Sequence, residues 1–276
     1  MDFITDILQY RFLTNALIAC VLSGITCGIV GTYVVCRRLV FLSGGITHSS
    51  FGGIGIAYYL GLNPTLGALV FAVLSALGIE WASGRGKMRE DSAIGIVWSV
   101  GMALGIIFIY MTPGYAPNLM SFLFGNILTV TDSDIRWLAV LTLVVVSLFA
   151  LAARRIMYVA FDRGFARSQG IPTEALSYGM AVLTAVTIVL SIRIVGIVML
   201  ISLLTMPAVI VNTRCKRFAA IMRWSALTAV CGNIIGLALS YRMNIPAGAA
   251  TIFVLTITLI IVKIVTLRSI SNKRRR

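Results

Sequence analysis

The sequence predicts an all-α integral membrane protein, a polytopic helical bundle of eight or nine transmembrane helices with one short cytoplasmic helix. Three observations lead to this fold class: the apolar composition, the succession of apolar segments, and the placement of the positive charges. Of the 276 residues, 59% are hydrophobic and 12% are charged, with a mean hydropathy of +0.99. Soluble domains carry about 25% charged residues, so the composition excludes a soluble globular protein, a disordered chain and a disulfide scaffold.

Nine apolar segments follow one another, and each approaches the roughly 20 residues that a helix needs to cross a bilayer. They comprise residues 12–36, 41–60, 63–82, 92–112, 134–153, 173–192, 194–213, 219–240 and 246–267. Segment 41–60 is rich in glycine and serine, and if it crosses only in part, eight spans remain. The connections are too short for a separate domain. Residues 1–276 are therefore expected to form a single transmembrane domain, which depends on other chains for soluble activities such as ATP hydrolysis.

The positive charges give the orientation of this bundle. Nineteen of the 23 Lys and Arg residues fall between alternate segments or at the C-terminus, and the other four are Arg11, Arg136, Arg193 and Arg242. Loops rich in Lys and Arg stay in the cytoplasm. The C-terminus is thus expected inside and, with nine crossings, the N-terminus outside, after a short amphipathic helix at the membrane surface. The net charge of +14 is a topology signal and implies no nucleic acid.

Ionisable groups at bilayer depth are costly and mark functional sites, and this chain has few of them. No carboxylate falls in the middle of an apolar segment, which argues against a transporter coupled to protons or sodium. Glu80 lies near the cytoplasmic end of its segment, beside Trp81, and we expect its side chain to reach the interface. No nucleotide-binding loop, catalytic carboxylate pair or nucleophile with a base is found, so we predict no enzyme.

His48 is the only histidine of the chain and lies in the run SGGITHSSFGGIG. Residues four apart share one face of a helix, so Gly44 and Gly52 are expected to leave space around the imidazole. Imidazole binds zinc, copper, iron and nickel. The pattern predicts a helix that lines a narrow path. The alternative is a histidine buried in a glycine-rich packing seam and hydrogen-bonded to a carbonyl of a neighbouring helix.

A second stripe on the same segment, Gly45, Ser49 and Gly53, has the spacing at which membrane helices approach closely. The pairs Gly24/Gly28, Gly101/Gly105 and Gly232/Gly236 repeat this spacing and are interpreted as helix packing. The five cysteines follow no metal-ligand spacing and are expected to be packing residues.

A short cytoplasmic helix is predicted in FDRGFARSQGIP, between the fifth and sixth segments. Asp162 is a typical N-cap, and Gly170 followed by Pro172 is a typical stop. The helix between them would be about two turns long and able to insert into a groove on a cytoplasmic partner. The alternative is a solvated turn whose basic residues face lipid headgroups. Pro207 is expected to kink the seventh segment and is a candidate for a gate.

Six of these stretches, in this order, resemble signatures of the permease subunits of ABC importers for zinc, manganese and iron. They are VVCRRLVFLSGGITHSSFGGIGIAYYLG, DSAIGIVWSVGMALGIIFI, FLFGNILTVTDSDI, FDRGFARSQGIP, IVGIVMLISLLTMPAV and LALSYRMNIPAGA. The resemblance implies a bacterial plasma-membrane importer built from a homodimer of this permease, two ATP-binding cassette ATPase subunits and an extracytoplasmic metal-binding protein. ATP would bind to the ATPase subunits, and this chain would carry no cofactor of its own.

The resemblance also implies roles for individual residues. In the second-helix signature Gly-Asp-x-x-Ser-His, the histidine corresponds to His48 and the serine to Thr47, whereas Gly44 occupies the aspartate position. The implied translocation path comprises His48, Thr47, Gly44 and Gly52. The implied ATPase coupling helix comprises Asp162, Arg163, Phe165, Ala166, Arg167 and Gly170. Without the aspartate, zinc is the first choice of cargo, and manganese, iron or a metal chelate are alternatives. A stand-alone secondary transporter or channel, or a membrane scaffold, is the competing class.

Overall fold

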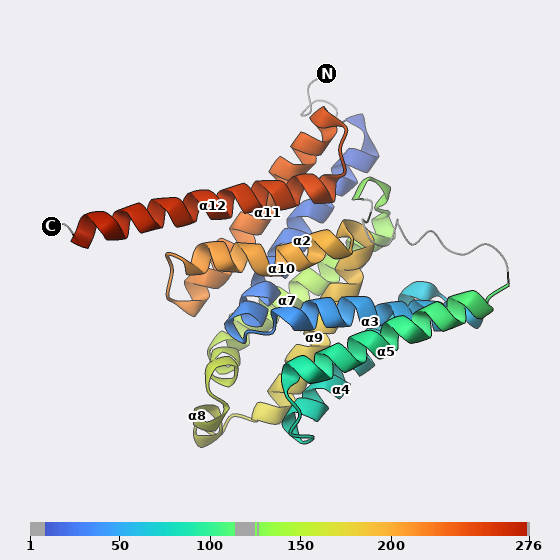
Figure 1. The fold of residues 1–276 in the computed structure, drawn as a ribbon. Coiled ribbons are helices and arrows are strands. Elements are labelled where there is room, and N and C mark those ends of the chain that lie inside the picture. Colours follow the sequence, from blue (N-terminus) through green and yellow to red (C-terminus); the bar gives the residue numbers. More distant parts are fainter. Residues whose placement is uncertain (1–8, 114–124, 126, 275–276) are drawn as a thin grey trace.

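The computed structural model describes residues 9–113, 125 and 127–274. All regular elements in this part of the chain are helices (Figure 1). They are α2 (Arg11–Cys36), α3 (Val40–Tyr59), α4 (Pro64–Gly84), α5 (Glu90–Met111), the 3-10 turn η1 (Ile127–Thr129), α7 (Asp132–Phe161), α8 (Arg163–Ser168), α9 (Thr173–Val195), α10 (Ile197–Asn212), α11 (Phe218–Met243) and α12 (Ala247–Arg274). The predicted fold class is confirmed.

Seven of the described helices are long and apolar enough to cross a membrane: α2, α4, α5, α7, α9, α11 and α12. Two further helices lie in the same bundle. The glycine- and serine-rich α3 has 20 residues, and the apolar α10 has 16 residues. The predicted N-terminal surface helix begins in residues 1–8, and part of the stretch FLFGNILTVTDSDI falls at residues 122–124 and 126. Both of these parts lie outside the described residues.

One segment boundary is wrong by two helical turns. The apolar stretch of the fifth segment ends at residue 153, yet α7 continues to Phe161. Its continuation carries Arg154 and Arg155 on the exposed surface. These arginines therefore belong to a helix and not to a loop. A helix does not stop where its apolar stretch stops, because its last turns are stable in water when they remain packed: Ile156 and Val159 are buried.

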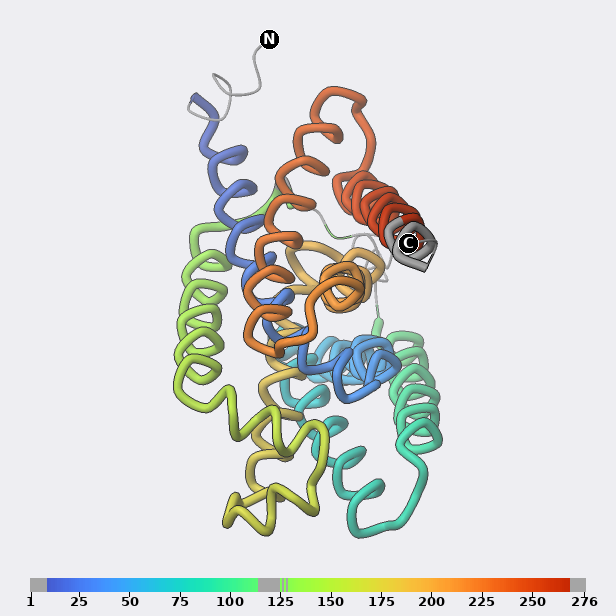
Figure 2. The backbone as a smooth tube through the Cα atoms, turned by 90° about the vertical axis from the view of Figure 1, so that its left-hand side faces the viewer, coloured from blue at the N-terminus to red at the C-terminus, as the bar shows by residue number. Residues whose placement is uncertain are grey.

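Helix α2 forms the centre of the bundle. Figure 2 shows it running between α7 on one side and α11 on the other. Glycines of α2 allow this close packing: a Cβ atom at Gly28 would lie 2.5 Å from the Ala226 Cα atom of α11. The predicted packing role of Gly24 and Gly28 is thus confirmed, and the second half of α2 is almost fully buried.

Helix α3 is held between α4 and α5 at backbone contact. A Cβ atom at Gly101 of α5 would lie 2.5 Å from the Ser49 Cα atom, and Gly53 faces Gly67 of α4. At these two positions the backbones meet directly, as the small-residue stripe of α3 predicts. The structure therefore places α3, α4 and α5 together as a tightly joined group.

Charged side chains lie at the two ends of the bundle. We call one end the arginine-rich end; it carries Arg37, Arg85, Arg163 and Arg167, which contact Glu80 and Glu174. At the opposite end, Arg11 contacts Asp132 at 2.5 Å and Arg193 contacts Asp134 at 3.2 Å, which joins the first turn of α7 to α2 and α9. Thr131 and Asp134 form a capping box that starts α7 there.

Candidate functional site

His48 lies on α3 with its ring half-buried and stacked on the indole of Trp98 from α5. The ring centroids are 4.5 Å apart and the planes are inclined by 6°. Stacking covers one face of the imidazole. A nitrogen lone pair points outward in the ring plane, so this contact fixes the ring without using the atoms that bind metal. Sequence reasoning missed Trp98, although its position on the glycine-rich face of α5, three residues before Gly101, was a usable signal.

The ring of His48 has no hydrogen bond or ion pair among the residues that the structure describes. The alternative of a buried histidine that donates to a carbonyl of a neighbouring helix does not match this arrangement. Among the described residues the imidazole contacts the Trp98 ring without a hydrogen bond, which leaves both nitrogens available to a ligand.

The two glycines on the His48 face have different surroundings. A Cβ atom at Gly44 would lie 3.6 Å from the Trp98 ring and 4.0 Å from Ile201 of α10, both ordinary contacts. A Cβ atom at Gly52 would lie 2.7 Å from the Gly101 carbonyl oxygen. Space for a Cβ atom therefore exists at Gly44, whereas the expectation that Gly52 leaves space around the imidazole is wrong. Gly52 allows α5 to approach α3.

Thr47 is fully buried, and its hydroxyl donates to the Ser43 carbonyl one turn earlier at 2.6 Å. Its carbonyl in turn accepts from the Ser50 hydroxyl at 2.6 Å. The structure thus places Thr47 beside His48 along the chain with its hydroxyl directed to the helix backbone.

No group of three or more His, Cys, Asp or Glu side chains capable of holding a metal ion is found in the described part of the chain. Stable protein metal sites use three or more ligands.

Helix α8 is capped at both ends, as its sequence predicts. The Asp162 side chain accepts a hydrogen bond from the Phe165 amide at 2.9 Å. At the other end Gly170 adopts a left-handed conformation with φ of 71°. The Gly170 and Ile171 amides donate to the carbonyls of Arg167 and Ala166 at 2.9 and 3.1 Å, which is a Schellman motif. The helix spans six residues, close to the predicted two turns.

The side chains of α8 divide into two faces. Ala166 is buried against the bundle, whereas Phe165 is 47% exposed and touches Tyr158 of α7 edge to face. Phe161, directly before the cap, is 65% exposed. The outer face of α8 therefore presents aromatic surface next to the last turn of α7.

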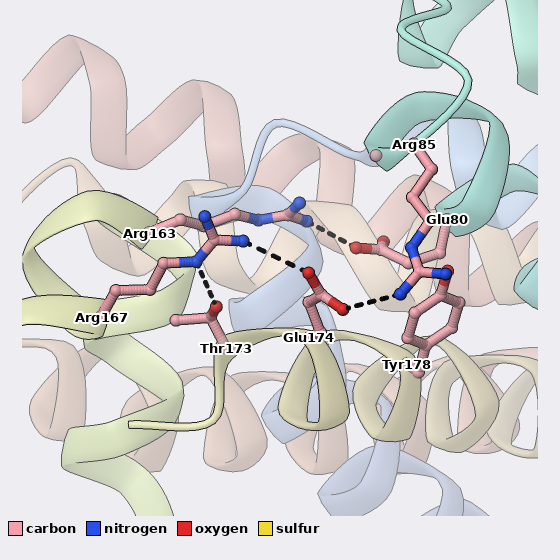
Figure 3. A pocket seen from close by; sticks show the side chains of 8 residues that line it. Glu80, Arg85, Arg163, Arg167, Thr173, Glu174 and Tyr178 are labelled. Carbon is pink, nitrogen blue, oxygen red and sulfur yellow. Dashed lines mark hydrogen bonds and ion pairs between the residues drawn. The ribbon is translucent and has the colours of Figure 1, made fainter. Parts of the chain in front are cut away.

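The arginines of α8 turn back toward the bundle (Figure 3). The Arg163 guanidinium contacts the Glu80 carboxylate of α4 at 2.6 Å. Arg167 contacts Glu174 at the start of α9 at 3.4 Å and donates to the Thr173 hydroxyl at 3.1 Å. A cavity of about 150 Å³ lies among these side chains. The alternative interpretation is a solvated turn whose basic residues face lipid headgroups. It does not apply to Arg163, because this side chain contacts Glu80 of the bundle.

Glu80 is a further residue whose role sequence reasoning missed. Its side chain is 9% exposed and is enclosed instead of extending into water; it lies between Arg163 and Arg37, whose guanidinium is 3.6 Å away. Arg37, itself 7% exposed, also contacts Glu90 at 3.1 Å and the Tyr33 hydroxyl at 2.9 Å. Burial opposes the charge of Arg37, but Tyr33 and the two carboxylates outweigh it, so the pKa of Arg37 lies above its usual value.

Pro207 is buried within α10, which remains a single helix on both sides of it. Proline has no amide hydrogen, so the Leu203 carbonyl one turn earlier lacks its usual donor. This leaves Pro207 as a gating candidate at a weakened point of a helix that faces α2 and α3.

A bundle of this kind, with a buried small-residue helix and a capped external helix, agrees with a family match. The model of the ABC 3 transport family matches residues 9–266. The chain belongs to this family.

Several proteins similar to this chain carry transport names. The manganese transport system membrane protein MntC of Listeria monocytogenes is 32% identical over 257 residues, which cover 93% of this chain and 91% of that protein. A probable iron transport system membrane protein of Haemophilus influenzae is 28% identical over 251 residues, 91% of this chain and 92% of that one. Among solved structures, PsaBC from Streptococcus pneumoniae, in complex with Fab, is similar with a TM-score of 0.83 and 28% identity over 94% of each chain.

Proposed function

We propose that this chain is the permease subunit of an ABC importer that moves a divalent transition-metal ion into the cytoplasm. The observation that carries the proposal is the family match over residues 9–266. Relatives named for manganese and iron transport support a metal as the cargo. In this assignment residues 1–276 act as one permease domain, and ATP is hydrolysed by separate ATPase subunits, so the chain itself is not an enzyme.

The arginine-rich end faces the cytoplasm in this proposal. The positive-inside rule supports the orientation, because most of the Lys and Arg residues gather there. The C-terminus of α12 then lies in the cytoplasm. Helix α8 lies at the same end and serves as the coupling helix: two caps hold its shape, and the exposed ring of Phe165 is suited to a hydrophobic groove on an ATPase.

The translocation path runs beside the face of α3 that carries His48, with Trp98 across from it and Thr47 and Gly44 adjacent. A single chain offers one imidazole there and no carboxylate. A two-fold axis beside α3 duplicates every group that faces it, so we propose an obligatory homodimer in which two His48 side chains meet the ion. Purification of a transporting complex with one permease for each pair of ATPase subunits would contradict this arrangement.

Zinc is the proposed cargo, because imidazole is a good zinc ligand while manganese favours oxygen ligands. Gly44 occupies the position of the aspartate in the signature that the sequence resembles. The names of the relatives favour manganese or iron as the second candidate. The imidazole of His48 thus favours zinc, whereas the names of the relatives favour manganese or iron. A measurement of uptake with each metal distinguishes these expectations.

The deciding experiment is uptake into proteoliposomes that contain this permease, with zinc, manganese and iron each offered separately. Uptake is measured with and without the ATPase subunits, ATP and the external metal-binding protein. The proposal expects metal uptake only when all are present. Uptake without ATP or a second subunit would instead support a stand-alone transporter or channel, and no uptake of any metal in the complete system would support a scaffold.

A further inference from the structure

The buried carboxylate of Glu80 links the external helix to the membrane bundle. One Glu80 oxygen lies 2.6 Å from Arg163, the first residue of α8, and the other lies 3.6 Å from Arg37, directly after α2. At 9% side-chain exposure, this carboxylate lies where an unpaired charge is strongly unfavourable. Separating α8 from α4 by even a small distance would leave that charge with fewer partners, so α8 and the end of α4 are expected to move together.

The same network reaches α5. Arg37 contacts Glu90, the first residue of α5, at 3.1 Å, and it donates to the Tyr33 hydroxyl of α2 at 2.9 Å. Four helices therefore converge at one cluster of charges, of which Glu80 and Arg37 are almost fully enclosed. Buried ion pairs of this kind contribute little net stability but fix a definite arrangement.

Helices α4 and α5 pack directly against α3, which carries His48, at the first turn of α4 and in the middle of α5. Gly53 meets Gly67 of α4, and Gly52 meets Gly101 of α5, in both cases backbone against backbone. Packed helices shift as units, because their contacts do not deform continuously. A displacement of α4 and α5 at the arginine-rich end is thus passed to α3 through these backbone contacts and through the Ile94 side chain of α5, which lies against Gly45.

We propose that Glu80 is a positioning residue through which movement of α8 reaches the helix that carries His48. This inference rests on the proposed function, in which α8 docks on the ATPase. The exposed ion pairs beside it differ: Glu174 contacts Arg167 and Arg85 at 3.4 Å each, with its side chain 59% exposed. Exposed pairs of this length contribute little, so Glu174, which joins α8 to α9 rather than to α4, supplies a control at the neighbouring contact of the same helix.

The test compares Glu80→Gln with Glu174→Gln in the complete transporter, reconstituted with its ATPase subunits and binding protein. The measured quantity is the metal taken up for each ATP hydrolysed. Glu80→Gln is expected to lower this ratio by about tenfold, equivalent to 1.4 kcal/mol, while ATP hydrolysis continues. Glu174→Gln is expected to change it by less than about twofold, as befits an exposed pair.

A second pair of variants keeps the test valid if Glu80→Gln does not assemble. Arg163→Met removes only the contact to α8, since Glu80 keeps Arg37, and is expected to uncouple in the same way. Arg163→Lys retains the positive charge and is expected to restore most of the coupling. The thermal unfolding temperature and the affinity for the ATPase subunits are measured alongside. If Glu80 has only a structural role, its loss would lower these two quantities, and the complexes that still assemble would keep the unmodified ratio of metal uptake to ATP hydrolysis.

The outcomes separate this inference from the proposed function. If the unmodified complex shows no ATP-dependent metal uptake, the proposed function fails. If it transports metal and the Glu80→Gln and Arg163→Met complexes keep its ratio of uptake to hydrolysis, the proposed function stands and the role of Glu80 is refuted.

Discussion

Replacing Asp162 by alanine is the sharpest perturbation of α8. The helix has six residues, far fewer than the roughly 12–15 that an isolated helix needs in water, so it depends on its caps and its contacts. The Asp162 side chain satisfies the Phe165 amide at 2.9 Å. Loss of an N-cap costs about 0.5–2 kcal/mol. Since 1.36 kcal/mol is a factor of ten, opening of α8 should become about 2- to 30-fold more frequent.

Hydrogen exchange measures this opening directly. The reporters are the amides of Ala166, Gln169 and Gly170, which donate to carbonyls within or next to α8. Asp162→Ala should accelerate their exchange by the factor given above, whereas amides in the middle of α2 should be unaffected. Metal uptake for each ATP hydrolysed should fall in the reconstituted transporter, because a frayed α8 transmits movement poorly.

Asp162→Asn is the matched control, since asparagine caps helices about as well as aspartate but carries no charge. It should leave both exchange and coupling near the unmodified values. The reasoning is refuted if Asp162→Ala leaves exchange in α8 unchanged, or if asparagine accelerates it as much as alanine does, in which case the charge of Asp162 and not its hydrogen bond matters.

Three further predictions concern α3 and its neighbours. His48→Ala should remove the selectivity among zinc, manganese and iron in the uptake assay while the thermal unfolding temperature stays unchanged, because alanine is well tolerated in helices; unchanged selectivity would make His48 a packing residue. Gly44→Asp should tighten metal binding, measured by calorimetry on the purified complex, and slow uptake, since it adds a carboxylate one turn from His48 and its Cβ atom makes only ordinary contacts with Trp98 and Ile201; weaker binding would contradict this. Gly101→Ala should lower the unfolding temperature, because its Cβ atom would lie 2.5 Å from the Ser49 Cα atom. The control is Gly95→Ala on the same helix, whose Cβ atom meets open space and which should be neutral or stabilising. Equal effects of the two variants would show that the α3–α5 contact is not tight.

The sequence predicts the helices well because hydropathy reports burial in lipid directly. Helix α4 was expected at residues 63–82 and spans 64–84, and α9 was expected at 173–192 and spans 173–195. The caps of α8 were predictable for a different reason: Asp162 and Gly170 act on atoms only a few residues away in the sequence. The length of α7 was not, because its last two turns are held by packing that the apolar pattern does not reveal.

The parts that sequence reasoning missed depend on contacts between distant residues. Glu80 was misplaced because its partner Arg163 lies 83 residues away, and nothing local distinguishes an interfacial glutamate from a buried one. Gly52 was misinterpreted in a similar way: helical spacing places it on the His48 face but does not reveal that Gly101 lies opposite. The stacking of His48 on Trp98 required the relative rotation of α3 and α5, which the sequence leaves open.

The junction between α7 and α8 has a consequence for engineering the protein. Asp162 is the only residue between the two helices: its amide donates to the Tyr158 carbonyl at the end of α7 while its side chain caps α8. An inserted residue there would turn α8 by about 100° relative to α7 if the helix continued, and would separate one function of Asp162 from the other. Affinity tags or fluorescent domains are therefore better accommodated in the connection between α10 and α11, whose residues Arg214 to Arg217 lie between helices without such a double cap.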